Sequence, residues 1–397
     1  MKKTTSMIFM ALAFLASSGT AGELIHFRDT TTSWDNVLII AAQQNKLVFV
    51  DAYTDWCVWC KVMDKETFSD SAVAKFMDEK FVPVKYEMET GFGLVMSEKY
   101  RVNGFPSFLI FTTDGKLVYR ILGYLKPKEF LEALNAALDP SKQEHLTGVS
   151  ASLEPGFPQF YKDSFLKGSL RKRPDSATVN SFLSSSPELA SEVAWSVLFR
   201  FSSQVNDNYR GFVYDNFEML KRMYGANDVQ STVGTFLSSD LNRAIKADDE
   251  PALRRIMAAA EKYSIGPIAQ INLNYQLRFY SGTNRWTRYA DLIDSAKRSG
   301  NALDENAMNS YSWTVYLKCD NKDVVARAAK WMGAAVETRP EYMLLDTYAA
   351  LLYKNGELKK AKEYAERAIA NGKQGKEDVQ ETEELLKKIN ASLEAKP

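Results

Sequence analysis

The sequence predicts two folded parts: an α/β domain with a mixed sheet and helices on both of its faces, then an all-helical domain. Three observations lead to this prediction. The chain of 397 residues is too long for one ordinary core and suits two domains. Strand and helix patterns alternate over residues 24–138, whereas no convincing strand pair follows from about residue 159 onward. Between these parts, residues 140–158 carry three prolines and two glycines, a composition typical of a linker.

The elements of the α/β part are expected in a regular order. Ser33 can cap a helix that begins beside it. Apolar, β-rich runs predict buried strands, and Thr113-Asp114-Gly115 predicts a hairpin turn between the last two. Pro127 suits the first turn of a closing helix. The expected strands are 47–53, 81–87, 107–111 and 116–121, and the expected later helices include 97–100 and 127–138.

Residues 159–397 are expected to be helical throughout. The segments 186–201 and 211–225 show helical spacing, and the second stops at a glycine. This periodicity gives no sign of strands, so the second domain is predicted to be all-α.

A possible repeat lies near the end of the chain, within 307–372. Residues 342–372 are predicted to form two helices joined by a turn at Asn355-Gly356, and residues 310–340 form a similar pair about 33 positions upstream. The spacing of small residues resembles the tetratricopeptide repeat. A plain helical bundle is the alternative.

The composition and the N-terminal sequence indicate which partners and which cell compartment to expect. Lys+Arg and Asp+Glu both number 50 and no basic stripe is visible, so we expect no nucleic-acid partner. A basic start, a short apolar run over 7–16 and small residues at Gly19 and Ala21 are typical of a signal peptide, here 1–21. A buried N-terminal helix is the alternative. We therefore expect a periplasmic protein that is not embedded in the membrane, in a compartment where disulfides persist.

Two of the three cysteines, Cys57 and Cys60, stand where strand 47–53 gives way to a helix. Free backbone N–H groups and the helix dipole favour negative charge there, which stabilises a thiolate. The two-residue spacer lets both sulfurs meet within one helical turn. The pattern therefore predicts a redox-active pair.

There are two alternatives to a redox pair. A structural zinc site needs four ligands, and the remaining candidates, Cys319, His26 and His145, are distant in sequence. The other alternative is a pair of inert core cysteines, since buried free cysteine is common. Cys319 itself is expected to be a small core residue of a helix. We expect neither a metal nor a cofactor.

The segment VFVDAYTDWCVWCK, with ETFSD at 66–70 and GFP at 104–106, resembles the thioredoxin superfamily. The resemblance is closest to the C-terminal thioredoxin-like domain of periplasmic thiol:disulfide interchange proteins of the DsbD type. It covers residues 24–138, under a third of the chain. It implies a thioredoxin-like fold for 22–139 and protein-disulfide oxidoreductase activity without a cofactor.

The resemblance also implies roles for single residues. Cys57 matches the exposed attacking cysteine, and Cys60 matches the more buried resolving cysteine. Asp51 matches a buried carboxylate that moves a proton to or from the second cysteine, and Lys85 matches the lysine that pairs with it. Pro106 matches the cis-proline that faces the disulfide. A strand-end cap and a surface charge are the alternatives for the aspartate and the lysine.

Three aromatic residues are expected to bind the substrate. Trp56 matches the tryptophan packed beside the active site. Trp59 lies between the cysteines and is expected to shape the docking surface. Phe105 precedes the proline, where the family more often has a smaller or β-branched residue. Val58 follows the first cysteine as in DsbD-type domains, which favours a reductant.

These features lead to two hypotheses. The first is a periplasmic reductase of protein disulfides that receives electrons from a membrane-bound donor; run backwards, the same chemistry makes an oxidase or isomerase. The second is a helical-repeat interaction or chaperone-like scaffold in which the redox pair is secondary. The joint presence of Asp51, Cys57, Cys60, Lys85 and Pro106 favours the enzyme.

Overall fold

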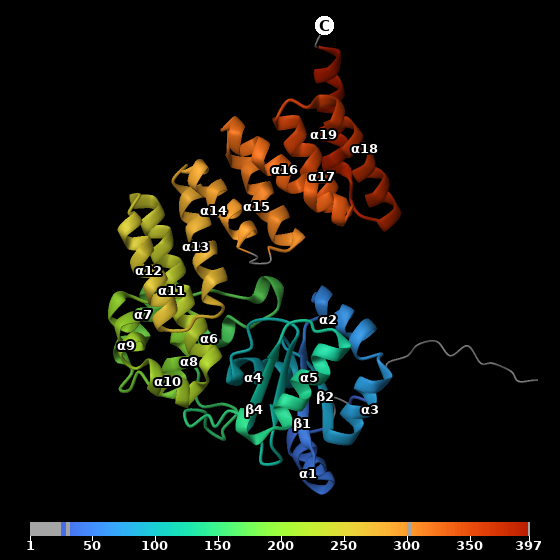
Figure 1. Cartoon of the computed structure of the whole chain (residues 1–397). Coiled ribbons are helices and arrows are strands. Elements are labelled where there is room, and N and C mark those ends of the chain that lie inside the picture. The colour runs from blue at the N-terminus through green and yellow to red at the C-terminus, as the bar shows by residue number, and fades with distance from the viewer. Residues whose placement is uncertain (1–24, 29–31, 300–302, 396–397) are drawn as a thin grey trace, which may run out of the picture. The chain divides into compact units, whose positions relative to one another are not determined.

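The computed structural model describes residues 25–28, 32–299 and 303–395 (Figure 1). The predicted signal peptide over 1–21 lies outside the described residues. The chain divides into a first compact unit that ends at Thr232 and a second that begins at Val233, so the boundary falls within α11 (Ala226–Ala247). No helix of the described ranges is long and apolar enough to cross a membrane.

Within the described part of the first unit, the sheet has four strands in the order β2-β1-β3-β4. The strands are β1 (Leu47–Tyr53), β2 (Phe81–Glu87), β3 (Ser107–Phe111) and β4 (Leu117–Leu122). β1 runs parallel to β2 and antiparallel to β3, which pairs antiparallel with β4. The predicted mixed sheet is therefore confirmed, with each strand within one residue of its predicted position.

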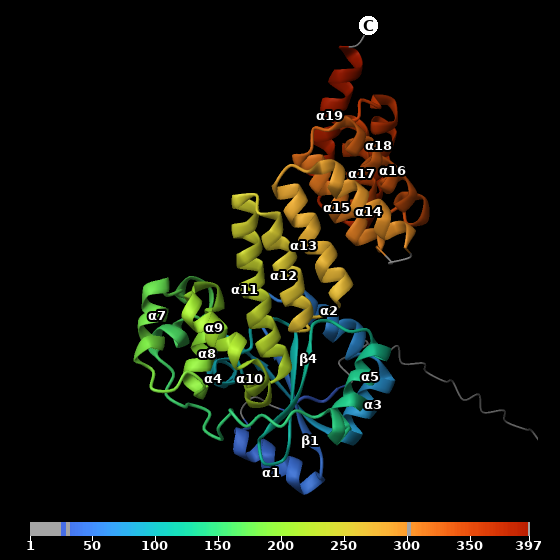
Figure 2. The ribbon, with the colours of Figure 1, turned by 60° about the vertical axis from the view of Figure 1, so that its left-hand side comes forward.

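Helices cover both faces of this sheet, as predicted. The helices and the π-helical turn of this region are α1 (Trp34–Gln44), α2 (Val58–Val62), η1 (Met63–Thr67), α3 (Ser71–Lys80), α4 (Gly91–Tyr100) and α5 (Pro127–Leu138). Side chains alternate along β1: Phe49 packs in the core with η1, α3 and α5, whereas Val48 and Val50 pack with α1 and α4. Ser33 caps α1 by accepting the Asn36 amide at 3.4 Å. Figure 2 shows α3 and α5 on one side of the sheet and α4 on the other.

Residues 140–232 pack on the α4 side of the same sheet (Figures 1 and 2). They form η2 (Pro140–Lys142), α6 (Gln159–Asp163), η3 (Gly168–Leu170), α7 (Ser176–Ser185), α8 (Glu192–Arg200), η4 (Ser202–Gln204), α9 (Asp207–Asp215) and α10 (Phe217–Tyr224). The segment predicted as a linker, 140–158, is held by backbone hydrogen bonds. The Glu144 amide donates to Val118 of β4 at 2.7 Å, and the Gly148 amide donates to Met223 of α10 at 2.9 Å.

Buried ion pairs also join the sheet domain to these helices. Lys99 lies 2.6 Å from Glu192, and Arg101 lies 2.8 Å from Asp228, which also contacts Arg120 at 3.1 Å. The Lys99 and Arg101 side chains are fully buried. The compact unit therefore continues past the predicted linker to Thr232. The division into domains 22–139 and 159–397 stays a prediction, and the buried ion pairs argue against stable folding of the first part by itself.

The helix predicted over 211–225 is in fact two helices, α9 and α10, which meet at Asn216. The Asn216 side chain donates to the Phe212 carbonyl at 2.9 Å. Such local side-chain bonds compete with helical hydrogen bonds and explain the break. α10 then ends at Gly225, where φ is +93°, as its predicted stop at a glycine requires.

The second unit contains helices that follow one another in chain order (Figure 1). They are α12 (Glu250–Lys262), α13 (Ile268–Gly282), α14 (Trp286–Arg298), α15 (Glu305–Lys318), α16 (Lys322–Thr338), α17 (Tyr342–Lys354), α18 (Leu358–Gly375) and α19 (Gln380–Glu394). α17 and α18 form the predicted helix pair, joined at Gly356, where φ is +83°. Cys319 is buried in the core, as expected, but it is the C-cap residue that follows α15 and does not lie within a helix. Burial raises the pKa of its thiol. The tetratricopeptide nature of these pairs stays a prediction.

Candidate active site

A disulfide joins Cys57 and Cys60 at the start of α2. The chain leaves β1 at Tyr53 and turns, with the Cys57 amide donating to the Thr54 carbonyl at 3.0 Å. Cys57 is the N-cap residue of α2, and its Sγ accepts the Cys60 amide at 3.0 Å. The helix start therefore places an N–H donor on the first sulfur, as the sequence predicted. Among the described residues, no group of three or more His, Cys, Asp or Glu side chains is placed to hold a metal ion.

The disulfide itself is covered, while its neighbours are exposed. Cys57 and Cys60 are each 4% exposed, so the expected greater exposure of Cys57 is not seen in the bonded pair. By contrast, Trp56 and Trp59 are each 58% exposed and Val58 is 68% exposed. An apolar rim of this kind is typical of a surface that docks another protein.

A buried ion pair lies in the sheet close to the redox helix. Asp51 is 2% exposed in the middle of β1, and its register partner Lys85 on β2 lies 3.3 Å from it. Lys85 also contacts Asp64 of η1. Burial lowers the pKa of Lys85, but Asp51 and Asp64 outweigh this effect and the net pKa is raised. The lysine therefore stays charged, and the alternatives of a strand-end cap and a surface charge do not fit these positions.

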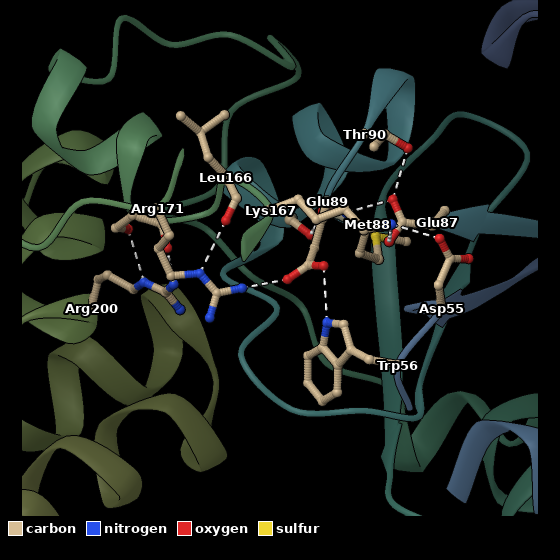
Figure 3. Close-up of polar contacts among 12 residues, drawn as sticks. Asp55, Trp56, Glu87, Met88, Glu89, Thr90, Leu166, Lys167, Arg171 and Arg200 are labelled. Atoms are coloured by element: carbon tan, nitrogen blue, oxygen red, sulfur yellow. Dashed lines mark hydrogen bonds and ion pairs between the residues drawn. The ribbon is translucent and has the colours of Figure 1, made fainter. Parts of the chain in front are cut away.

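Trp56 is held by a chain of polar contacts that crosses from the sheet domain to the helices (Figure 3). Its indole N–H donates to Glu89 at 2.9 Å, and Arg171 pairs with the other oxygen of that carboxylate. A second bridge joins Lys167 to Asp55, two residues before Cys57, at 2.5 Å. The helical segment after α6 thus positions residues that flank the redox pair.

The remaining predicted residues surround the same site. The Phe105–Pro106 peptide is cis, which confirms that prediction. Phe105 packs edge-on against Trp56 with ring centroids 5.8 Å apart. Pro106 leads into β3, whose first residue pairs with β1 one position after Asp51. Trp59 packs on Tyr124 at 5.4 Å.

Sequence reasoning missed Asp64, Glu89 and Arg171. Asp64 could have been predicted from the sequence, because it lies about two helical turns after Cys57 and therefore on the same face of the expected helix. No sequence pattern predicts the pairing of Glu89 with Arg171, since 82 positions separate them and charged residues are usually assigned to the surface.

Comparison with known proteins agrees with this geometry. A family model described as "Thioredoxin-like domain" matches residues 34–138. Over 99 residues the chain is 35% identical to the thiol:disulfide interchange protein DsbD of Actinobacillus pleuropneumoniae and 31% identical to that of Pasteurella multocida. Each match covers 24% of this chain and 17% of the relative, so the chain spans about a sixth of the length of these relatives.

Among solved structures, the oxidised C-terminal domain of DsbD from Neisseria meningitidis is 25% identical. That match covers 28% of this chain and 96% of the other, with a TM-score of 0.24. The family match and the fold show that residues 34–138 form a thioredoxin-like domain with a disulfide-bonded C-x-x-C pair. The sequence of this domain is similar to a segment of thiol:disulfide interchange proteins of the DsbD type.

Proposed function

We propose that the protein is a periplasmic thiol–disulfide oxidoreductase that reduces disulfides in other proteins. The observation that carries this proposal is the Cys57–Cys60 disulfide at a helix start, covered but ringed by exposed apolar side chains. A helix start favours the thiolate of the first cysteine, and an apolar rim offers a docking surface for a polypeptide. The resemblance to DsbD, a thiol:disulfide interchange protein, supports this class of reaction, and Val58 after the first cysteine, as in DsbD-type domains, favours the reductive direction.

The proposed reaction begins with the reduced pair. The Cys57 thiolate attacks one sulfur of the substrate disulfide, which breaks the substrate S–S bond and releases one substrate thiolate. Cys60 then attacks Cys57 in the mixed disulfide, releases the second substrate thiolate and leaves the Cys57–Cys60 disulfide. Two electrons pass to the substrate, whose sulfurs take up two protons. A membrane-bound donor is proposed to return the two electrons.

Neighbouring residues are proposed to assist these steps. We assign to Asp51, which is buried and paired with Lys85, the exchange of a proton with Cys60 as that thiol becomes a nucleophile. Trp56, Trp59 and Phe105 supply apolar contacts, and the backbone beside Pro106 pairs with an extended substrate segment.

Trapping tests this mechanism. Cys57→Ser should abolish insulin reduction, whereas Cys60→Ser should accumulate mixed disulfides on Cys57. Cys319→Ser is the matched control, since that cysteine is buried in the second unit, and it should reduce insulin at the normal rate. Activity that survives in Cys57→Ser, or trapping on Cys60, would contradict the mechanism. The reduction potential against glutathione then separates a reductase from an oxidase or isomerase.

A second candidate is an interaction or chaperone-like scaffold. The helix pairs of the second unit favour it, because stacked helix pairs offer extended binding surfaces. A scaffold would suppress aggregation of an unfolded client equally well in the Cys57→Ser, Cys60→Ser double variant. The reductase proposal expects that double variant to have lost its main activity.

A further inference from the structure

A cavity of about 250 Å³ opens beside the redox pair, within the first unit. Its wall on the sheet domain includes Trp56 and Phe105, which directly precede Cys57 and Pro106 in the chain. Its opposite wall carries three arginines, Arg171, Arg173 and Arg200, which we call the arginine pocket. The cavity therefore joins the proposed substrate-docking surface to a cluster of guanidinium groups.

Only part of this positive charge is balanced. Arg171 pairs with Glu89, the carboxylate that also accepts the Trp56 indole N–H (Figure 3). Arg200 makes contacts with neutral groups: its guanidinium donates to the Ser164 hydroxyl at 3.0 Å and carbonyl at 2.6 Å. It also lies 4.0 Å above the Phe165 ring. These contacts fix its orientation without neutralising it.

Arg173 is exposed, and among the residues that the structure describes neither it nor Arg200 forms an ion pair. Glu89 is the one carboxylate that lines this cavity within the described residues, against three guanidinium groups. Burial, together with the nearby charges of Arg171 and Arg173, lowers the pKa of Arg200 to about 10. Since a pKa of about 10 is still well above neutral pH, Arg200 stays protonated, and an added anion would relieve the repulsion.

We infer that the arginine pocket binds the carboxylate of an Asp or Glu side chain in the polypeptide whose cysteine is attacked by Cys57. Arginine binds carboxylates strongly because its planar fork can donate two hydrogen bonds. Consecutive Cα atoms are about 3.8 Å apart, so a peptide reaches roughly 10–15 Å within four residues of its cysteine. Because Trp56 lines this cavity and directly precedes Cys57, we place the acidic residue within about four positions of the substrate cysteine. This inference rests on the proposed function and adds a substrate preference to it.

The test measures mixed-disulfide equilibria on the full-length Cys60→Ser variant. Each peptide has one cysteine and an amidated C-terminus. The peptides form pairs whose members differ only by Glu or Gln at one position, which is one of the four positions on either side of the cysteine. Cys57 is first converted to its mixed disulfide with β-mercaptoethanol, a neutral reference thiol, by reaction with the symmetric disulfide of that thiol. Each peptide thiol then exchanges with this group and releases β-mercaptoethanol, and the peptide mixed disulfide on Cys57 is quantified by intact-mass spectrometry. We expect at least one Glu peptide to be favoured over its Gln partner by about fivefold to tenfold at low salt, and less at high salt.

Matched variants locate the effect. Arg173→Gln removes an exposed pocket charge and should cut the Glu preference to about twofold or less, as should Arg200→Gln. Arg222→Gln removes the same charge from an exposed arginine outside the cavity and should preserve the preference. If Arg200→Gln does not fold, Arg173→Gln still decides the question.

Three results would overturn the inference. Equal equilibrium constants of exchange for the Glu and Gln members of every peptide pair would refute it while leaving the proposed function intact. An equal loss of preference in Arg173→Gln and Arg222→Gln would assign the effect to net charge rather than to the pocket. Failure of every peptide to form a mixed disulfide would contradict the proposed function, and the inference would fall with it.

Discussion

Asp51 is the residue on which the proposed chemistry depends most after the cysteines. It is 2% exposed, and it shares Lys85 with Asp64, whose side chain is 33% exposed. The two carboxylates therefore contact the same lysine from different environments. Burial makes Asp51 the better candidate for proton transfer, because water cannot replace it there.

We predict that Asp51→Asn slows the release step far more than the first attack. Asparagine keeps the shape but cannot exchange a proton, and general acid–base catalysis is commonly worth about 100-fold or more. Single-turnover kinetics with a fluorescent disulfide peptide separate the two steps. Asp64→Asn is the matched control and should change the release rate by less than about threefold, since the 33% exposed side chain is accessible to solvent. Equal slowing in both variants would remove the special role of Asp51.

Glu98 gives a prediction about stability and pH. Burial raises its pKa from the usual 4.5 to about 6, against a smaller opposing effect of Lys162. The folded protein therefore binds a proton more tightly than the unfolded chain, so this group lowers stability as pH rises from about 4.5 to 6. Glu98→Gln should raise the free energy of unfolding at pH 7 by about 1–2 kcal/mol and leave it nearly unchanged at pH 4. Urea unfolding at both pH values tests this; an equal change at both would indicate a packing effect.

At the scale of elements, the sheet domain was predictable and its attachment to the later helices was not. The strands have local signatures, since β1 and β3 are continuous apolar runs and β3 and β4 are joined by a Thr113-Asp114-Gly115 turn. The pair of Lys99 with Glu192 has no such signature, because the partners are 93 positions apart and both look like surface residues in sequence. The redox pair was predictable from its spacing and its position at a helix start, whereas the cis peptide was predictable only because the family resemblance supplied its context.

We predict that Lys99→Met costs about 3–5 kcal/mol of stability, because it leaves the Glu192 carboxylate buried without its cation. The double variant Lys99→Met, Glu192→Gln should recover a large part of this loss. Lys116→Met is the control: its ion pair with Asp114 is exposed, and the change should stay within about 0.5 kcal/mol. Thermal unfolding of all three reports the differences. A small effect of Lys99→Met would mean that α8 contributes little to holding the sheet domain.

At the scale of the whole molecule, the two ways of dividing the chain make different predictions. The proline- and glycine-rich segment 140–158 suggested a sheet domain that ends near residue 139, whereas the compact unit continues to Thr232. Composition could not reveal this, because a segment without helix or strand can still be fixed by hydrogen bonds such as that from Gly148 to Met223.

We predict that a fragment of residues 22–232 folds and reduces insulin at a rate close to that of the full chain. A fragment of residues 22–140 exposes the buried Lys99 and Arg101 side chains without their partners and loses the Arg171 contact to Glu89. It should unfold at a clearly lower temperature or aggregate. Circular dichroism and the insulin assay compare the two. If the short fragment is as stable and active as the longer one, the contacts of residues 140–232 serve only substrate recognition.

The second unit is therefore the candidate for selecting the partner protein. The proposed chemistry and the arginine pocket both lie within residues 22–232, whereas the helix pairs α15–α16 and α17–α18 contribute no residue to either. We predict that Cys60→Ser versions of the full chain and of fragment 22–232 trap a generic disulfide-containing protein, such as insulin, equally well. From a periplasmic extract, however, the full chain should enrich a smaller set of proteins by about tenfold, as expected for a helical surface that raises the local concentration of its partners. Quantitative mass spectrometry of the trapped proteins compares the two sets.

Identical sets in identical proportions would leave the second unit without a role in substrate choice. They would favour a role in assembly or anchoring, and a measurement of the mass of the intact protein in solution then tests for assembly.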